Sequence, residues 1–450
     1  MEFSVEGKRV TVAGAARSGI AAAELLARRG AAVTLSDVRP QVDEAAPLRA
    51  LGVRLELGGH DFTGADLLVL SPGVPPDQPA VRAARARGVA VIGEVELASR
   101  WLRGRVIAIT GTKGKSTTTA LTGLVLETAG FTATVGGNIG SPLSAQVSSS
   151  TPDSLHVVEV SSFQLETIDT FHPWIAVMLN LSSDHLDRHP SVAAYEGAKA
   201  RIFENQDAGD WAVVNADDPG VLRLAERSRA ARRAFSRRSG VSEGTLVENG
   251  WIVDRRQTRT ERLVPLDVIH LLGAHLVDDV MAAATVGAIV GAAPAAITAA
   301  VDAFRGLEHA MEVVAEAGGV RFVNDSKATN VASALGAIES FEGGLVPIIG
   351  GHFKGGDLGR LREPLAKRAR AVVSIGASRP LVREALAGAV DVYDAASIED
   401  AVGAAFELAR PDGVVLLAPA CASFDMFRDY ADRGRRFKEA VARIVRERRS

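Results

Sequence analysis

The clearest chemical feature of the sequence is a glycine-rich loop between a strand-like run, residues 106–110, and a helix-like segment, residues 115–128. Its residues are Gly111, Thr112, Lys113, Gly114, Lys115, Ser116 and Thr117. Glycines let backbone N–H groups converge on phosphate oxygens at the positive end of a helix. The loop has two residues between its glycines, where the general pattern has four. It predicts a site for the phosphates of ATP; the alternative is a glycine-rich turn that binds nothing.

Side chains in and beyond the loop can act on those phosphates. Lys115 can reach the β- and γ-phosphates, and Ser116 or Thr117 can offer a hydroxyl to Mg²⁺. A further oxygen ligand is predicted in the apolar run at residues 157–160, because a carboxylate such as Glu159 is costly to bury without a partner. A structural ion pair is the alternative explanation for Glu159.

Two nitrogen-bearing side chains follow. His185 comes soon after the apolar run at residues 175–179, at a predicted strand end where α/β proteins place ligand sites, so it is either a metal ligand or a structural histidine. Lys199 shares the apolar face of a helix-like segment with Tyr195 and Ile202. A lysine in that position usually extends its charge to water. The alternative is a lysine of lowered pKa that adds CO₂ and becomes, as a carbamate, an anionic metal ligand.

Strand-like and helix-like segments alternate along the chain, which is typical of an α/β fold with mostly parallel sheets. We expect three domains, at residues 1–93, 94–304 and 305–450. The outer two should be Rossmann-like and the central one a phosphate-loop ATPase. The uncharged stretch at residues 280–301 is rich in alanine and is interrupted at Gly291 and Pro294. It therefore predicts two buried helices and not a membrane span.

Composition limits the partners of the protein. The 450 residues include 51 Lys and Arg and 54 Asp and Glu, which give a formal charge of −3. This balance argues against a surface for nucleic acid or anionic membranes. The single cysteine, Cys421, excludes an intramolecular disulfide. The first residues lack a signal-peptide pattern, so we expect a cytoplasmic protein with no membrane insertion. We also expect a monomer.

The first block carries a second glycine pattern, which runs from Gly14 to Gly19 after a strand-like segment. Asp37 falls about where dinucleotide-binding proteins place the acid that binds a ribose. Alone, this pattern suggests NAD. However, Ala16 replaces the second glycine of that fingerprint, and the same helix N-terminus suits the pyrophosphate of UDP equally well.

Together these motifs resemble the Mur ligases, whose relatives include the folylpolyglutamate synthases. The resemblance covers essentially the whole chain. Its most specific segments are residues 136–140 (Gly-Gly-Asn-Ile-Gly), 324–330 (Asn-Asp-Ser-Lys-Ala-Thr-Asn) and 418–427 (Ala-Pro-Ala-Cys-Ala-Ser-Phe-Asp-Met-Phe). They are most similar to the D-glutamate-adding members. The resemblance implies an ATP- and Mg²⁺-dependent, ADP-forming ligase of peptidoglycan synthesis, which joins D-glutamate to UDP-N-acetylmuramoyl-L-alanine through an acyl phosphate.

The resemblance also implies roles for individual residues. The predicted ATP site comprises the loop at residues 111–117 with Asp325 and Lys327. The predicted metal ligands are Ser116, Glu159, His185 and Lys199 as a carbamate. Contacts to the UDP substrate are expected from Ser18, Asp37, Ser71, Gly73, Asn138, Ser161 and Gln164. Contacts to D-glutamate are expected from Thr329, Lys354, Ser423 and Tyr430. The predicted catalytic residues are Lys115, His185, Lys199 and Lys327.

Three positions depart from the family pattern. The family usually has Asn where this chain has Leu276 and Asp279, and Arg where it has Ala310. Because amide and guanidinium contacts are lost, we expect altered ATP affinity or phosphate positioning with the same reaction.

Three rival functions follow from the same residues. A sister ligase or folylpolyglutamate synthase would couple another amino acid, an NAD-dependent oxidoreductase would bind NADH, and a non-catalytic relative would not hydrolyse ATP.

Overall fold

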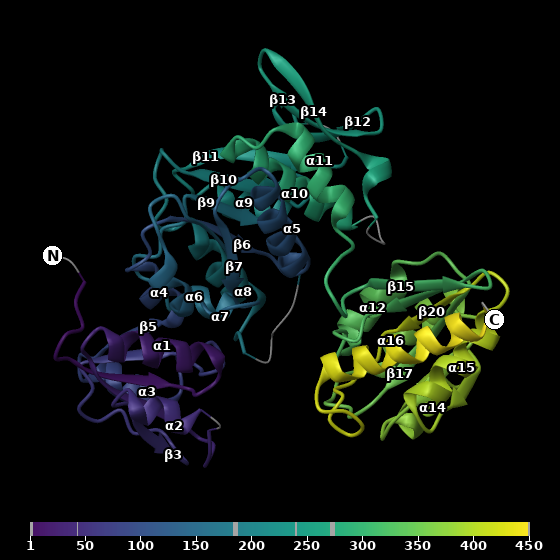
Figure 1. Ribbon diagram of the computed structural model, residues 1–450, viewed down its shortest axis with the longest axis horizontal. Helices are drawn as coiled ribbons and strands as arrows, with labels where there is room; N and C mark the ends of the chain where they lie inside the picture. The colour runs from purple at the N-terminus through teal and green to yellow at the C-terminus, as the bar shows by residue number, and fades with distance from the viewer. Residues whose placement is uncertain (1–2, 43, 183–187, 239–240, 271–274, 449–450) are drawn as a thin grey trace. The chain divides into compact units, whose positions relative to one another are not determined.

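The computed structural model describes residues 3–42, 44–182, 188–238, 241–270 and 275–448. Their strands form three sheets, of five, nine and six strands (Figure 1). The chain divides into two compact units. Met1–Ile269 with Val277–Ala303 contain the first two sheets, and His270–Leu276 with Phe304–Ser450 contain the third. The α/β fold with mostly parallel sheets is confirmed.

The first sheet has the order β3-β2-β1-β4-β5, and all its neighbouring strands are parallel. Its strands are β1 (Arg9–Ala13), β2 (Ala32–Asp37), β3 (Arg54–Leu57), β4 (Leu67–Leu70) and β5 (Ala90–Gly93). Its helices are α1 (Arg17–Arg28), α2 (Ala45–Ala50) and α3 (Pro79–Ala86). The strand order reverses between β1 and β4, and ligands of such sheets bind outside the carboxyl ends of the strands at that reversal.

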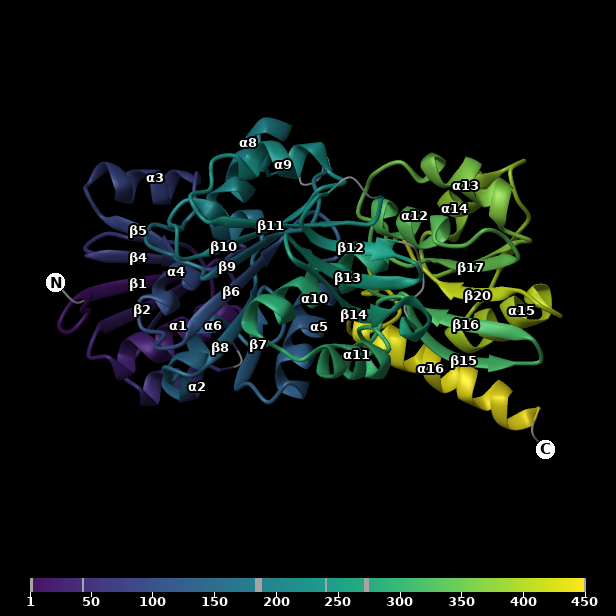
Figure 2. The same cartoon turned by 90° about the horizontal axis from the view of Figure 1, so that it is seen from above.

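The second sheet has the order β14-β13-β12-β11-β10-β9-β6-β8-β7. Seen from above, the labels β10, β9, β6, β8 and β7 follow one another in that order (Figure 2). Its parallel strands are β6 (Arg105–Thr110), β7 (Ala133–Gly137), β8 (Leu155–Glu159), β9 (Ile175–Met178), β10 (Trp211–Asn215), β11 (Ala231–Ser236) and β12 (Gly244–Glu248). β6 is an interior strand between β9 and β8, so the glycine-rich loop that follows it lies away from both edges of the sheet.

Helices of this part include α4 (Glu94–Ser99), α5 (Lys115–Thr128), α6 (Leu143–Gln146), α7 (Ser162–Leu165), α8 (Val192–Ala200), α9 (Pro219–Ala225), α10 (His275–Val290) and α11 (Pro294–Ala303). The break predicted at Gly291 and Pro294 lies between α10 and α11. Among the described residues, no helix is both long and apolar enough to cross a membrane.

An antiparallel extension of the second sheet was not anticipated from the sequence. It consists of β13 (Trp251–Arg256) and β14 (Arg259–Pro265), which pair with each other and with β12. Asn249 and Gly250, between β12 and β13, have φ values of 49° and 77°. This pair is the two-residue hairpin turn that an Asn-Gly sequence favours, because both residues tolerate positive φ. The signal was therefore present in the sequence.

The third sheet has the order β15-β16-β20-β17-β18-β19. Its strands are β15 (Glu312–Ala317), β16 (Val320–Asn324), β17 (Leu345–Gly350), β18 (Val372–Ile375), β19 (Val392–Asp394) and β20 (Val414–Leu417). Only the β15–β16 pair is antiparallel among them. The helices are α12 (Val331–Glu339), α13 (Arg362–Arg368), α14 (Arg379–Leu386), α15 (Ile398–Ala409) and α16 (Tyr430–Glu447).

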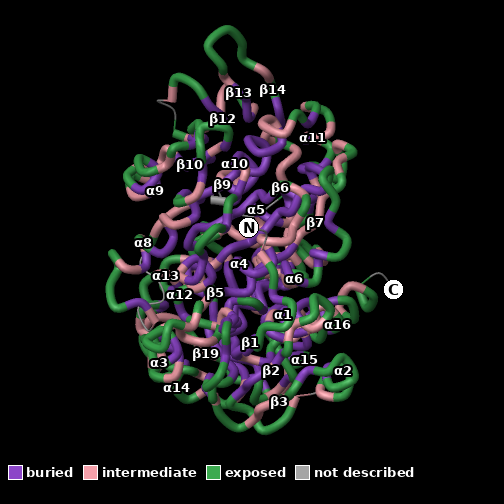
Figure 3. Tube along the Cα trace, turned by 90° about the vertical axis from the view of Figure 1, so that its left-hand side faces the viewer, coloured by how far each residue is buried: buried purple, intermediate pink, exposed green. Residues whose placement is uncertain are grey.

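The central strands of each sheet are buried along their length, whereas exposed residues concentrate in loops and helix surfaces (Figure 3). Burial on both faces explains why these strands read as continuous apolar runs in the sequence.

A buried carboxylate in α4, the helix between β5 and β6, binds a segment of the chain that precedes β9. Glu96, in α4, accepts hydrogen bonds from the backbone N–H groups of Asp169, Thr170 and Phe171 at 2.8–3.0 Å. The Thr170 hydroxyl and the Arg100 guanidinium donate to the same carboxylate at 2.7 and 2.6 Å. Burial alone would raise the pKa of Glu96, but these donors outweigh it and lower the pKa below its usual value.

We predict that Glu96→Gln destabilises the protein by about 2–3 kcal/mol, because hydrogen bonds to a charged group are worth about that much. A carboxylate with a depressed pKa stabilises the fold above its unfolded-state pKa and loses that effect as pH falls through the folded-state pKa. Thermal unfolding at pH 7.5 should therefore show a lower midpoint for the variant than for wild type. The difference between the two midpoints should become smaller as the pH is lowered into the acid range. Glu127→Gln, at an exposed position, is the matched control; equal midpoints for Glu96→Gln and wild type would contradict the prediction.

Candidate active site

The phosphate loop has the backbone geometry that its glycines allow. Gly114 lies at the N-cap of α5 with φ of 83°, and Gly111 has φ of 155°. A Cβ atom on Gly114 would lie 2.1 Å from Oδ1 of Asp279, and one on Gly111 would lie 3.0 Å from Cβ of Leu179. Both positions therefore require glycine, and the amino end of α5 opens directly onto the loop.

Asn180 fixes the shape of this loop. Its side-chain oxygen accepts hydrogen bonds from the backbone N–H groups of Thr112 and Lys113 at 3.2 and 2.8 Å. Its amide nitrogen donates to the Lys113 carbonyl at 3.0 Å. The Lys115 ammonium donates to the Thr112 carbonyl at 2.9 Å, so the lysine side chain folds back over the loop. Asn180 directly follows the apolar run of β9, a position that could have marked it in the sequence.

A buried carboxylate joins three elements beside the loop. Glu159, at the end of β8, accepts a hydrogen bond from the Ser116 hydroxyl at 2.7 Å and another from the Asn138 amide at 2.7 Å. Ser116 belongs to the first turn of α5, and Asn138 follows β7. The predicted metal ligands Ser116 and Glu159 thus offer oxygen atoms next to the phosphate loop, which suits a hard cation such as Mg²⁺.

Lys199 turns inward from α8 and does not reach solvent. Its ammonium donates to the carbonyl of Gly111 at 2.7 Å and lies 4.8 Å from the ring centroid of Tyr195. The Tyr195 hydroxyl in turn lies 3.0 Å from the Thr112 hydroxyl. The alternative in which Lys199 extends its charge to water does not hold, because α8 packs this face against the loop and the side chain is buried. The structure places the amine beside the proposed phosphate site.

Ser161 and Gln164 serve the start of α7. The Ser161 hydroxyl accepts from the Gln164 backbone N–H at 3.2 Å, and the Gln164 side-chain oxygen accepts from the Ser161 backbone N–H at 2.9 Å. This reciprocal arrangement is a capping box. Within the described residues, the buried Nε2 of Gln164 has no hydrogen-bond partner. His189 was not singled out from the sequence; its Nε2 lies 2.9 Å from the Ser162 hydroxyl, and its ring stacks on Phe163.

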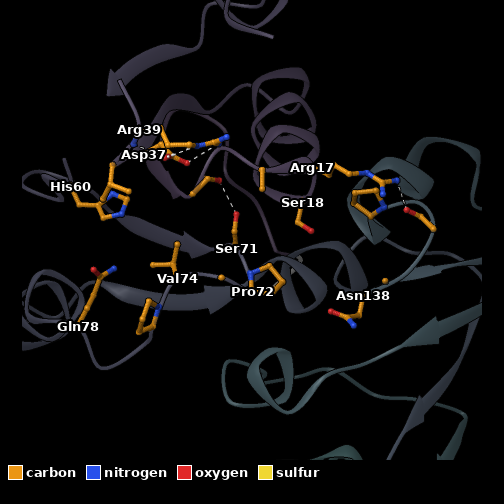
Figure 4. A pocket seen from close by; sticks show the side chains of 18 residues that line it. Arg17, Ser18, Asp37, Arg39, His60, Ser71, Pro72, Val74, Gln78 and Asn138 are labelled. Atoms are coloured by element: carbon orange, nitrogen blue, oxygen red, sulfur yellow. Dashed lines mark hydrogen bonds and ion pairs between the residues drawn. The ribbon is translucent and has the colours of Figure 1, made fainter. Parts of the chain in front are cut away.

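A cavity of about 570 Å³ lies where the carboxyl ends of β1 and β4 meet the segment after β7 (Figure 4). The residues predicted to contact a UDP substrate that line it are Ser18, Asp37, Ser71, Gly73 and Asn138. Ser161 and Gln164 are not among its lining residues. The Arg17 guanidinium donates to the carbonyl of Gly140 across this cavity, within the first compact unit. A cavity of this size suits a nucleotide-sized ligand.

Asp37 is saturated by protein donors. Its Oδ1 accepts from the backbone N–H and Nε of Arg39 at 2.8 and 3.0 Å, and its Oδ2 accepts from Ala15 N–H and an Arg39 guanidinium nitrogen at 2.6 and 3.1 Å. Burial would raise the pKa of Asp37, but these bonds hold it at about 2. A carboxylate has about four acceptor positions, and all four are occupied. Arg39 was not foreseen, although its spacing of two residues from Asp37 permits this pairing.

In the second unit, three of the four predicted D-glutamate contacts, Thr329, Lys354 and Ser423, lie on loops that follow β16, β17 and β20. The Ala328 carbonyl accepts from Ala420 N–H at 3.0 Å, which joins the Thr329 loop to the loop preceding Ser423. His352 and Ala422 exchange backbone hydrogen bonds at 2.9 Å, which brings the segment leading to Lys354 to the same loop.

Arg433 locks these loops together. Its fully buried guanidinium donates to the hydroxyl and carbonyl of Ser326 at 2.9 and 2.8 Å and to the carbonyl of Cys421 at 3.1 Å. Burial lowers its pKa to about 10, which still leaves it charged at neutral pH. An arginine in an amphipathic helix usually indicates a solvated face, so this role of Arg433 could not be predicted from the sequence pattern.

The remaining predicted residues have distinct positions. Asp325 is buried, and burial raises its pKa to about 6 despite a hydrogen bond from Met311 N–H. Lys327 donates its backbone N–H to the His309 carbonyl at 3.0 Å. Tyr430 begins α16 and is exposed. His185 lies outside the described residues.

Family profiles match three successive parts of the chain. The profile described as Mur ligase MurD-like, N-terminal domain, matches residues 8–93; Mur ligase middle domain matches residues 109–287; and Mur ligase, glutamate ligase domain, matches residues 309–421.

Curated relatives match over nearly the full length. The UDP-N-acetylmuramoylalanine–D-glutamate ligase of Solibacter usitatus is 47% identical over 441 residues, covering 98% of both chains. The enzyme of the same name from Acidobacterium capsulatum is 46% identical over 447 residues, covering 98% of this chain and 97% of its own.

Solved structures share the fold at low identity. The UDP-N-acetylmuramate-alanine ligase MurC of Thermotoga maritima has a TM-score of 0.60 at 19% identity, covering 97% of this chain and 100% of its own. The MurF ligase of Thermotoga maritima in complex with ADP has a TM-score of 0.59 at 17% identity, covering 99% and 96%.

Asp279, one of the positions that depart from the family pattern, lies under the phosphate loop. It is buried against Gly114 and near Thr118, and within the described residues its Oδ2 has no hydrogen-bond partner. Burial raises the pKa of Asp279 well above its usual value, the charge of Asp278 adds to this effect, and Thr118 and Lys115 oppose it only partly. The carboxyl group therefore favours its protonated form in the folded protein.

We predict that Asp279→Asn stabilises the protein, and more so at pH 8 than at pH 5. A carboxyl group with a raised folded-state pKa costs stability as pH rises above its unfolded-state pKa, whereas an amide does not titrate. Thermal unfolding should show a midpoint about 3 °C higher at pH 8, which corresponds to about 1 kcal/mol. Asp153→Asn, at an exposed position, is the control. A lower midpoint for Asp279→Asn at pH 8 would refute the interpretation.

Proposed function

Because this chain belongs to the UDP-N-acetylmuramoylalanine–D-glutamate ligases of the Mur ligase family, we propose that it forms the amide bond between UDP-N-acetylmuramoyl-L-alanine and D-glutamate. ATP supplies the driving force and is converted to ADP and phosphate. The observation that carries this conclusion is the 47% identity over almost the entire chain, together with a phosphate loop whose Ser116 contacts a buried carboxylate.

The proposed division of labour follows the three sheets. We assign residues 1–93 to binding of the UDP substrate, residues 94–304 to ATP, and residues 305–450 to D-glutamate. The cavity at β1 and β4 supports the first assignment, because the amino end of α1 can face a pyrophosphate there. The convergent loops held by Arg433 support the last, because a carboxylate-bearing amino acid needs several fixed donors.

The residues beside the loop fit Mg²⁺. The Ser116 hydroxyl and the Glu159 carboxylate are hard oxygen donors, and the hydrogen bond between them shows that both point to one place. We propose that Ser116, Glu159, His185 and a carbamate on Lys199 would hold the ion. Bound Mg²⁺ would neutralise charge on the phosphates during transfer.

The side chains of the protein then have defined tasks. Lys115 and the N–H groups of the loop would bind the ATP phosphates, and Asp325 and Lys327 would complete the nucleotide site. The alanyl carboxylate attacks the γ-phosphorus, which gives an acyl phosphate and ADP. The amine of D-glutamate attacks the acyl carbon, and phosphate leaves. Donors fixed in advance stabilise the developing charge without reorganisation, which is the main source of rate in such transfers.

Lys199 is proposed to act as a carbamate. Its ammonium would lose a proton, and the neutral amine would then add CO₂ with loss of a second proton, which converts a cation into an anionic carbamate. Its burial against the loop supports this proposal, because a carbamate at this position would lie beside the proposed phosphate site, where an anionic oxygen can bind Mg²⁺. We further propose that the enzyme works in the cytoplasm, where its nucleotide substrates are found, and as a monomer.

The reaction itself provides the first test. Purified protein with ATP, Mg²⁺, UDP-N-acetylmuramoyl-L-alanine and D-glutamate should release ADP and phosphate in equal amounts. Release should depend on D-glutamate and should fall to background with L-alanine or L-glutamate in its place. Release of AMP, or turnover that ignores the amino acid, would overturn the proposal; NADH binding in a fluorescence titration would favour an oxidoreductase instead.

Lys199→Ala tests the carbamate. We expect at least about a hundredfold loss of kcat, since one anionic ligand near the transferring phosphate is removed. Short carboxylates such as acetate should restore part of the activity by occupying the vacated space. Lys367→Ala removes an exposed lysine and is the matched control. Full activity of Lys199→Ala, or a loss that no carboxylate restores, would count against the carbamate.

A further inference from the structure

The cavity of the first unit has two ends of different chemistry. Arg17 and Asn138 lie toward one end, and His60 and Gln78 lie toward the other (Figure 4). Asn138 also donates to Glu159 beside the phosphate loop. If the cavity binds the UDP substrate, as proposed above, the alanyl end must extend toward Asn138 to meet ATP. The nucleobase must then occupy the end with His60 and Gln78.

The hydrogen bonds around His60 determine its tautomer. The Ser36 hydroxyl lies 3.0 Å from the Gly59 carbonyl and 2.9 Å from Nδ1 of His60. A carbonyl can only accept, so the single hydroxyl proton of Ser36 points to Gly59. The Ser36 oxygen must then accept from an N–H at Nδ1 of His60. Nε2 consequently carries a lone pair and can accept a hydrogen bond, and the His60 side chain lines the cavity.

Two further observations support a neutral acceptor at this point. Burial lowers the pKa of His60, and only the charge of Asp37 opposes this effect. Asp37 cannot supply the acceptor itself, because Ala15 and Arg39 occupy both of its oxygens. His60 therefore provides an acceptor that the saturated carboxylate does not.

Gln78 provides the complementary donor. It lines the same cavity, and within the described part of the chain its Nε2 is shielded from water without a hydrogen-bond partner. A buried amide donor without an acceptor is unfavourable. Rotation about the terminal torsion, which is soft in glutamine, can direct this donor into the cavity, toward a carbonyl group of a bound ligand.

We propose that His60 and Gln78 recognise the uracil base, with Nε2 of His60 accepting from the ring N3–H and the Gln78 amide donating to O4, the carbonyl that cytosine replaces with an amino group. Uracil presents a donor flanked by acceptors on this edge. Cytosine presents an acceptor at N3 and a donor at its amino group, so both contacts would be reversed. The pair would thereby select uridine over cytidine nucleotides.

The test compares binding of UDP and CDP by isothermal titration calorimetry, without ATP or D-glutamate. Wild type should bind UDP at least about tenfold more tightly than CDP, because each mismatched buried hydrogen bond costs about that factor. Gln78→Glu replaces the donor with an acceptor of the same shape. It should weaken binding of UDP about tenfold and reduce or invert the preference for UDP over CDP. Gln41→Glu, at an exposed position outside the cavity, is the matched control.

His60→Phe is the second variant, since it keeps a ring and removes both nitrogens. It should weaken UDP about tenfold while CDP changes little. In steady-state assays both variants should raise KM for the UDP substrate and leave KM for ATP and D-glutamate unchanged. Unaltered UDP-to-CDP ratios in both folded variants would overturn this inference and leave the ligase function standing. Failure of wild type to bind UDP at all would instead overturn the proposed function.

Discussion

The buried carboxylate of Glu159 is the interaction on which the rest of the first unit depends. A charge at the end of an interior strand is tolerated only where polar partners meet it. Ser116 brings the amino end of α5 to it, and Asn138 brings the segment after β7. Since Ser116 follows the phosphate loop and Asn138 lines the cavity of the first sheet, this one group links the proposed nucleotide and UDP-substrate sites.

In the second unit, a buried positive charge is likewise surrounded by polar partners. Arg433 is buried because three carbonyl and hydroxyl oxygens from separate loops surround its guanidinium. Around Asp37, by contrast, protein donors fill every acceptor position, so the acid shapes its loop. The buried charged side chains of Arg433 and Asp37 thus hold separate segments of the chain together.

Local sequence patterns predicted much of the fold, because the relevant forces are local. The apolar run predicted at residues 106–110 lies within β6 (Arg105–Thr110), since a strand buried on both faces needs no alternation of polar and apolar residues. The Pro294 break separates α10 from α11 as expected. The β13–β14 extension was missed although Asn249-Gly250 signalled a turn. The family resemblance assigned residues to sites by their motifs. A motif identifies the residues but does not show which other residues they contact.

Sequence by itself therefore determined the α/β class, the phosphate loop and the family, because glycine spacing and apolar periodicity are properties of neighbouring residues. Tertiary structure alone decided that Lys199 is buried against Gly111, that Arg39 saturates Asp37, and that the helix-borne Arg433 is buried among loops. These outcomes depend on which distant segments come together, and on the dielectric environment that results. Neither the contacts between distant segments nor the local dielectric environment can be deduced from a single sequence.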